Sequence, residues 1–334
     1  MKKLYIVTIL HNVGKFVLSV FLLSVLVFTV SRLAPGDPLY AFYGERVEKM
    51  SAAQQEEARE RLGLHEPLVT QYGRWLRGAV RGDFGISYQY KRDVKEVIAA
   101  RIGNTLLLGG LGFGLTFVLA LFLGLFCAWR EDRAADRIIC AIGTVTSCIP
   151  EFWLSLLLLL VFAVWLGWLP GSGAYSVGKE GDAADRAVHL VLPLAVVVLG
   201  HLWYYAFQVR NRLLEEVRAD YVLLARMKGL GGRQVLYRHC LRGAMPSYLS
   251  MMAVALPHIL GGTYVVETVF SYPGIGTLAY ESARYQDYNL LMVVSLLTGT
   301  LVIFCNLLAG SIGGRIDPRM RRHGGADGWE VKSR

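Results

Sequence analysis

Long apolar runs without a charged side chain are the feature that most limits how this chain can fold. The run Val17–Val30 has three hydroxyl side chains as its polar members, and the run Leu154–Pro170 has one, Ser155. Across 334 residues, 54% are hydrophobic and 18% are charged, whereas soluble domains are about 45–50% apolar and about 25% charged. Uncharged runs of about 20 residues predict membrane-spanning helices, because in lipid only a helix or a closed barrel satisfies every backbone group.

The apolar runs predict an all-α integral membrane protein with six transmembrane helices. The third run is too long for a simple crossing, so we expect it to end in an interfacial turn near Trp165 and Trp168, where aromatic belts lie. No small-x-small cleavage site follows the first run, which predicts an uncleaved first helix. The predicted spans are Asn12–Ser31, Asn104–Trp129, Ile138–Trp168, Ala187–Phe207, Met245–Phe270 and Asn289–Gly314.

Lysine and arginine residues gather in alternate connections between these spans. If the N-terminus is cytoplasmic, the inner segments hold most of them, among them Lys2, Lys3, Arg130, Arg133, Arg210, Arg212, Arg226, Lys228, Arg315 and Arg319. The two short outer loops hold only Lys179, Arg186 and Arg284. Because basic residues accumulate on the cytoplasmic side, both termini are predicted to be cytoplasmic. The formal net charge of +9 is then mainly a topology signal, and nucleic acid is not an expected partner.

Two connections are long enough to be more than loops. The segment after the first span contains a polar helical stretch, Val47–Leu62, and predicts a small extracytoplasmic cap. The segment from about 208 to 245, between spans four and five, predicts two short cytoplasmic helices separated by a break at Gly229, before Pro246 opens span five. The predicted division is 1–31 for the N-terminus and first span, 32–101 for the cap, 102–314 for the five-span core and 315–334 for a cytoplasmic tail.

Motifs of enzyme chemistry are missing from the sequence. It has no HExxH, GxSxG or GxGxxG motif, and in the one approximation to a phosphate-binding loop Glu180 stands where Ser or Thr is needed. The histidines and cysteines also lack the spacing of metal ligands. We therefore expect no catalytic residue, no metal site and no cofactor bound by this chain, and any energy must come from a gradient or another subunit.

The inner segment carries the most specific pattern, Asp-Tyr, Ala-Arg and Lys-Gly-Leu over residues 220–230, followed by a basic stretch up to Pro246. It resembles the coupling segment of ABC importer permeases, in the version of the dipeptide, oligopeptide and nickel permease family. Further similarities to that family follow in order along the chain: Ala34-Pro35-Gly36-Asp37-Pro38, Leu62-Gly63-Leu64, Gly82-Asp83-Phe84-Gly85, Ile149-Pro150, Leu192-Pro193, Glu267-Thr268-Val269-Phe270 with Pro273-Gly274-Ile275-Gly276, and Asp317-Pro318-Arg319.

The resemblance implies a transport subunit of the bacterial inner membrane that has no chemistry of its own. This chain and a second homologous permease subunit would form the pathway through the lipid. Two ABC ATPase subunits, which carry ATP and Mg, would dock at the inner segments. An extracytoplasmic substrate-binding protein would deliver the substrate to the outer face.

The resemblance also implies which residues couple the chain to an ATPase. A short amphipathic helix would offer an apolar stripe to a groove on the ATPase; the alternative is a basic helix lying on anionic lipid. The glutamate of the generic importer pattern is absent, since Leu223 stands at its position. The salt-bridge role of that glutamate is therefore not assigned to Leu223. The implied coupling residues are Asp220, Tyr221, Leu224, Ala225, Lys228, Gly229 and Leu230.

Polar groups within spans are candidates for the pathway. His258 lies in the middle of span five, where lining the pathway and packing as a satisfied histidine are both open interpretations. Glu267 is nine residues further on, which places it on the opposite helical face. We expect it to anchor the outer end of the span beside the turn of Pro273, Gly274 and Gly276, a candidate gate.

Two other classes of protein remain as alternatives. A gradient-driven secondary transporter needs an intramembrane carboxylate relay and usually internal repeats, and a membrane-embedded enzyme needs paired catalytic groups within the spans. The sequence favours neither of them. For the substrate of an importer, the basic tail Arg319–His323 tilts the prediction slightly toward nickel or a metal chelate over di- or oligopeptides.

Overall fold

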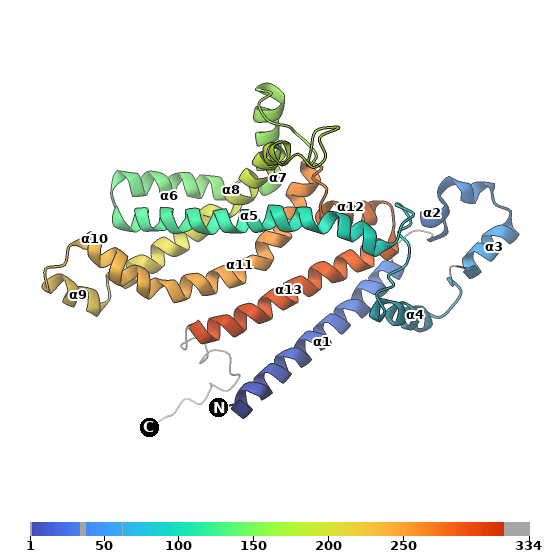
Figure 1. Cartoon of the computed structure of the whole chain (residues 1–334), viewed down its shortest axis with the longest axis horizontal. Helices are drawn as coiled ribbons and strands as arrows, with labels where there is room; N and C mark the ends of the chain where they lie inside the picture. The colour runs from blue at the N-terminus through green and yellow to red at the C-terminus, as the bar shows by residue number, and fades with distance from the viewer. Residues whose placement is uncertain (1, 34–37, 62, 317–334) are drawn as a thin grey trace. The chain divides into compact units, whose positions relative to one another are not determined.

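The computed structural model describes residues 2–33, 38–61 and 63–316, and within these residues the chain is helical and contains no β-strand (Figure 1). Five helices are long and apolar enough to cross a membrane, and counting one bent helix pair as a crossing raises the number to as many as six. The predicted all-α membrane fold is therefore confirmed. The motif residues 34–37 and the tail residues 317–334 lie outside the described part of the chain.

The long helices extend beyond the predicted spans at several ends. α5 begins at Val94 rather than Asn104, and α8 runs from Ala183 to Val217 rather than over 187–207. Hydropathy marks the part of a helix that suits lipid, whereas backbone hydrogen bonding continues into the polar flanks. The helices of the five crossings are α1 (Lys2–Leu33), α5 (Val94–Trp129), α8 (Ala183–Val217), α11 (Leu241–Val269) and α13 (Tyr288–Ile316).

The third predicted span is not a single helix. α6 (Ala134–Ser147) and α7 (Glu151–Leu158) are bent by 100° across a short break, and α7 continues as a π-helical segment, Leu159–Trp165. Pro150 lies in the break, where its ring disfavours helical geometry in the preceding residue. The third predicted span is therefore a broken pair of helices, which still counts as one of up to six crossings, and its helical part ends at Trp165, near the predicted end.

The start of the fifth crossing also differs from the prediction. α10 (Gly232–Val235) and a π-helical segment, Leu236–Cys240, lead directly into α11, so a continuous helical stretch covers residues 232–269. Pro246 therefore lies inside the helix and does not open it. A proline inside a helix removes one backbone hydrogen bond, but tolerance of such positions is greater in membrane helices.

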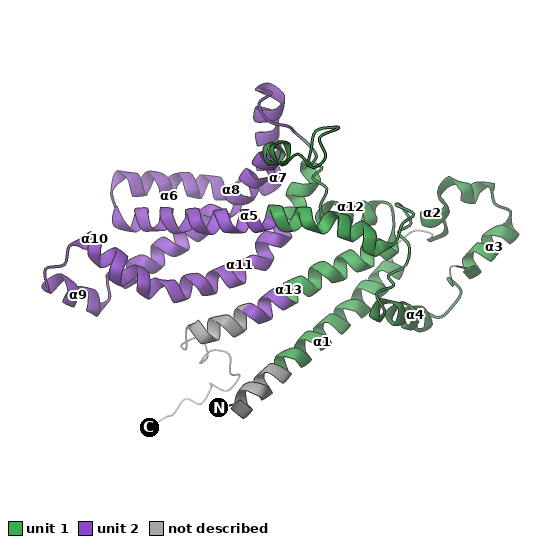
Figure 2. Ribbon diagram, in the orientation of Figure 1, with its two compact units in different colours: residues 1–108, 172–189, 263–303 green, residues 109–171, 190–262, 304–334 purple. Residues whose placement is uncertain are grey.

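The chain forms two compact units, each assembled from separated stretches (Figure 2). Unit 1 comprises residues 1–108, 172–189 and 263–303, and unit 2 comprises residues 109–171, 190–262 and 304–334. Each unit brings together stretches that lie far apart in the sequence. The units group residues by their contacts in space, whereas the segments predicted from the sequence follow the order of the chain.

Unit 1 contains the segment predicted as an outer cap. It forms α2 (Pro38–Tyr43), a 3₁₀-helix over Gly44–Lys49, α3 (Ala52–Arg61) and α4 (Leu68–Val80). The predicted helix over 47–62 is therefore shorter, and its first residues belong to the 3₁₀-helix. A small core fixes these elements, and its fully buried members are Leu39, Val47 and Ala58.

A buried aspartate ties the end of this outer segment to the start of α13. Oδ2 of Asp287 accepts hydrogen bonds from the Ser87 hydroxyl at 2.5 Å and from the Gln89 backbone N–H at 3.1 Å. Oδ1 accepts from the backbone N–H of Leu290 in the first turn of α13, at 3.2 Å. Asp287 thus acts as a helix N-cap and as a tether between stretches about 200 residues apart.

Replacing Asp287 by alanine is expected to lower the free energy of unfolding by about 2–3 kcal/mol, because a helix cap is lost and two buried donors lose their acceptor. Thermal unfolding of the purified protein in detergent would measure the loss. Asp83→Ala is the control, since Asp83 is exposed and accepts one local hydrogen bond, from Gly85. Equal stability of both variants would contradict the tether.

Candidate functional site

The coupling segment folds as a short helix, α9 (Asp220–Met227), ended by a turn at Gly229. Gly229 has a φ of +81°, in the left-handed region where glycine is favoured. Val222 and Ala225 are buried in the hydrophobic core of unit 2. Leu224 is 55% exposed and Met227 78% exposed, so the helix is held from one side and presents large apolar side chains on the other.

The predicted coupling residues divide between these two sides of α9. Tyr221, Leu224 and Lys228 are exposed, as is Asp220 at the helix start. Ala225 is buried and Leu230 packs against the core, so these two support the helix and do not form its surface. Leu223, which replaces the glutamate of the generic pattern, is also exposed.

Two acidic residues that the sequence prediction did not include hold this segment in place. The Tyr221 hydroxyl donates to Glu216 at 2.5 Å, and Arg218 forms an ion pair with Glu131 at 2.8 Å. Desolvation and the hydrogen bond to Glu216 raise the pKa of Tyr221 above its usual value, which keeps its hydroxyl protonated as a donor. No sequence motif marks either acidic residue.

In unit 1, Glu267 is fully buried and binds the turn that follows α11. Its Oε2 accepts from the Gly276 backbone N–H at 2.7 Å, and its Oε1 accepts from the Thr105 hydroxyl at 2.7 Å. Thr105 in turn accepts from the Ile275 backbone N–H at 2.8 Å. The predicted contact between Glu267 and the turn is therefore confirmed.

The same turn is held from α5 by a second contact. The Asn104 side-chain amide donates to the carbonyl of Pro273 at 2.7 Å. Pro273 and Gly274 lead into α12 (Ile275–Arg284), which begins with Gly274 as its N-cap. The predicted gate residues Glu267, Gly274 and Gly276 thus belong to one hydrogen-bonded unit, which links the end of α11 and the start of α12 to α5.

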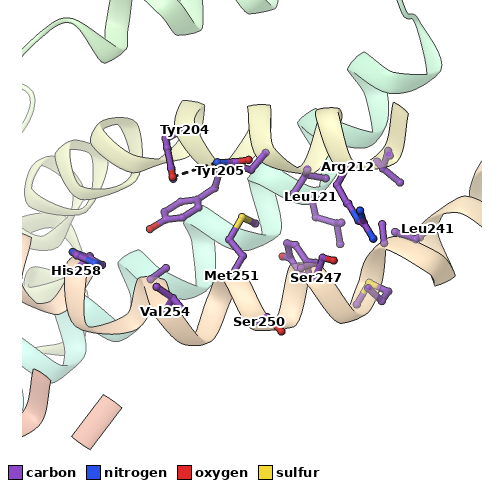
Figure 3. Close-up of a pocket in the computed structure, with 17 residues that line it drawn as sticks. Leu121, Tyr204, Tyr205, Arg212, Leu241, Ser247, Ser250, Met251, Val254 and His258 are labelled. Carbon is purple, nitrogen blue, oxygen red and sulfur yellow. Dashed lines mark hydrogen bonds between the residues drawn. The ribbon is translucent and has the colours of Figure 1, made fainter. Parts of the chain in front are cut away.

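Unit 2 contains a cavity of about 640 Å³ between α5, α8 and α11, a size typical of ligand pockets (Figure 3). His258 lines it, and Figure 3 shows His258 and Arg212 toward opposite ends of the cavity. Among the described residues that line it, none carries a carboxylate. The other polar or aromatic members are Tyr204, Tyr205, Gln208, Ser247, Tyr248 and Ser250.

A polar contact between Glu151 and His201 lies next to Tyr205 of the cavity wall. Glu151, the first residue of α7, places Oε1 3.4 Å from Nδ1 of His201 on α8. The ring of His201 stacks on that of Tyr205, with 6.5 Å between centroids. The pair therefore fastens the bend between α6 and α7 to the helix that forms the cavity wall. Within the described residues, no group of three or more His, Cys, Asp or Glu side chains could hold a metal ion.

Helices long and apolar enough to cross a membrane, a short helix with exposed apolar side chains and a cavity between the long helices of unit 2 are typical of a membrane transport subunit. Residues 120–322 match the family described as binding-protein-dependent transport system inner membrane component, and residues 5–109 match its N-terminal domain family. The chain belongs to this family, the permease subunits of ABC importers, and is a multi-pass protein of the inner membrane.

Individual relatives are similar over most of the chain. The oligopeptide transport system permease protein AppB of Bacillus subtilis is 34% identical over 89% of this chain and 94% of its own length. A protein of Sinorhizobium fredii named as a probable peptide ABC transporter permease is 30% identical over 90% of this chain and 94% of its own length.

Among solved structures, an inward-facing form of the MetNI methionine ABC transporter contains a similar chain. The match has a TM-score of 0.55 and 18% sequence identity, and it covers 67% of this chain and 97% of the other. At this level of identity, the similarity supports the fold.

Proposed function

We propose that this chain and a second homologous permease form the pathway of an ATP-driven peptide importer. Two ATPase subunits, with ATP and Mg, dock on the cytoplasmic side, and a binding protein delivers peptide to the extracytoplasmic side. Both termini are cytoplasmic in this arrangement. The observation that carries the proposal is α9, which is anchored by buried Val222 and Ala225 while its large apolar side chains are exposed.

The exposed apolar side chains of α9 are better suited to burial in a protein groove than to contact with water. Exposed apolar patches rimmed by polar residues mark interaction sites, and here Arg226 and Lys228 flank Leu224 and Met227. A helix that lays such a face into a groove is a recurring mode of recognition. A partner that moves α9 would bias the permease between its inward-open and outward-open states.

The cavity in unit 2 supports peptide as the substrate class. Its aromatic rings, hydroxyl groups and thioethers suit uncharged backbone and varied side chains, whereas nickel prefers imidazole and other strong donors in a defined geometry. The names of the two relatives above also refer to peptides. We therefore favour peptides over nickel or a metal chelate.

The turn bound by Glu267 supports a gate at the outer end of the pathway. A buried carboxylate that accepts hydrogen bonds from two separate elements holds them in one arrangement. Breaking these bonds would be required for the turn to move. We place Glu267, Pro273, Gly274 and Gly276 at this gate and His258 on the wall of the pathway.

Uptake into proteoliposomes tests the proposal and its alternatives. The complex is purified with the ATPase and binding proteins that co-purify with it. It is expected to take up a labelled oligopeptide when ATP is present on the side of the membrane that carries the ATPase subunits. A protonophore should leave the uptake unchanged. Uptake that follows an ion gradient without ATP would indicate a secondary transporter, and uptake of nickel without peptide would overturn the substrate class.

A further inference from the structure

Three elements of unit 2 meet at the carboxylate of Glu216, near the end of α8. Oε2 of Glu216 accepts the hydroxyl hydrogen of Tyr221 on α9, with 2.5 Å between the oxygens. Oε1 lies 3.3 Å from Nη2 of Arg212, one turn earlier on α8. The side chain of Glu216 is only 14% exposed, so water screens these contacts weakly.

The third element is the first turn of α11. A Cβ atom at Gly243 would lie 2.6 Å from Oε2 of Glu216 and 3.1 Å from the hydroxyl of Tyr221. The backbone of α11 therefore closes directly over the Glu216–Tyr221 contact. A side chain at Gly243 would have to displace the carboxylate.

Arg212 extends this contact to the cavity. It lines the cavity wall at the end opposite His258 (Figure 3). Its Nη1 also donates to Glu215 at 2.8 Å, but Glu215 is 64% exposed and reaches neither α9 nor α11 in any described contact. A continuous path of side chains thus runs from α9 through Glu216 and Arg212 to the cavity wall.

We propose that Glu216 is a positioning residue that links the coupling helix to the substrate cavity through Tyr221 and Arg212. When a partner displaces α9, the Tyr221–Glu216–Arg212 contacts move the Arg212 side of the cavity wall with it. In the reverse direction, a ligand that contacts Arg212 biases the position of α9. Such coupling is reciprocal by thermodynamic necessity. The inference rests on the proposed function, since it assumes a partner ATPase on α9.

The test is the stimulation of ATP hydrolysis in the complete complex in lipid nanodiscs. The stimulation is measured as the ratio of two ATP hydrolysis rates, one with and one without peptide-loaded binding protein. The peptides come from a casein digest. Glu216→Gln is expected to lower this ratio by about fivefold or more, the lower range of allosteric coupling. Glu215→Gln removes the same charge one residue away and is expected to stay within about twofold of the native ratio.

A double-mutant cycle separates a linked path from independent effects. Tyr221→Phe removes only the hydroxyl, and we expect the double variant with Glu216→Gln to have the same ratio as Glu216→Gln alone. Gly243→Ala keeps all charges and displaces the carboxylate, so it is expected to lower the ratio as Glu216→Gln does.

Three outcomes would overturn the inference. Glu216→Gln could match Glu215→Gln, the double variant could show the product of two separate losses, or Glu216→Gln could lower both rates in equal proportion, as a structural role would. A native complex without any stimulation would instead refute the proposed function, so the two failures are distinguishable.

Discussion

Replacing Leu224 by aspartate is expected to separate the permease from its ATPase subunits while leaving the permease folded. Leu224 is 55% exposed on α9, so the substitution leaves the core of unit 2 intact. A charge at the centre of an apolar interface commonly costs about 2 kcal/mol or more, roughly 30-fold in affinity. Co-purification of the ATPase subunits with the permease in mild detergent measures the effect.

A matched control places the same charge on another exposed apolar residue. Val69 on α4 is 83% exposed in the outer segment of unit 1, and Val69→Asp is expected to retain the ATPase subunits in full. The interpretation of α9 as the docking helix would be wrong if Leu224→Asp retained them as well. Equal losses in both variants would point to general destabilisation.

Replacing Glu267 by alanine is expected to cause the largest loss of stability, about 3–5 kcal/mol. The variant leaves the Gly276 N–H and the Thr105 hydroxyl buried without their acceptor, at about 1–3 kcal/mol each. It also leaves a cavity where a fully buried side chain stood. Thermal unfolding in detergent and the yield of folded protein in the membrane both report the loss.

The amide variant separates hydrogen bonding from packing at this position. Glu267→Gln keeps the volume but can accept from only one of the two donors, so we expect a loss between that of Glu267→Ala and none. Thr268→Ala is the neighbouring control, because its hydroxyl bonds only to Tyr264 on the same helix. If Glu267→Ala were as stable as Thr268→Ala, the turn would not depend on this carboxylate.

The apolar runs were sufficient to predict most of the fold. A run such as Val17–Val30 has few stable conformations in lipid, so α1 follows almost directly from composition. The ends were less predictable, because α5 and α8 continue into polar sequence where no contrast in hydropathy marks a boundary. α9 was predictable as a short helix that ends at Gly229.

The bend in the third span could not be read from the sequence. Pro150 indicates a break, but the angle of 100° between α6 and α7 depends on what the two helices pack against. The contact between Glu151 and His201 is part of that packing. His201 lies within the predicted fourth span, and nothing in the sequence connects it to the break.

Polar contacts between distant helices were the main omission. Asp136 and Arg210 form two hydrogen bonds at 2.8 and 2.7 Å, although they are 74 positions apart in the chain. The sequence did not predict this pair. Glu216 was missed because its partner Tyr221 was assigned to the outer surface of α9. Such pairs depend on how helices pack, which periodicity along one helix does not report.

In the proposed function, this permease couples peptide delivery to ATP hydrolysis on partner subunits. The most direct measurement is the ATPase rate of the purified complex in nanodiscs, with and without peptide-loaded binding protein. We expect the rate to rise with the loaded binding protein in the native complex, and we expect that rise to be lost when Leu224→Asp releases the ATPase. An ATPase rate that is indifferent to the loaded binding protein, or a rise that persists in Leu224→Asp, would contradict it.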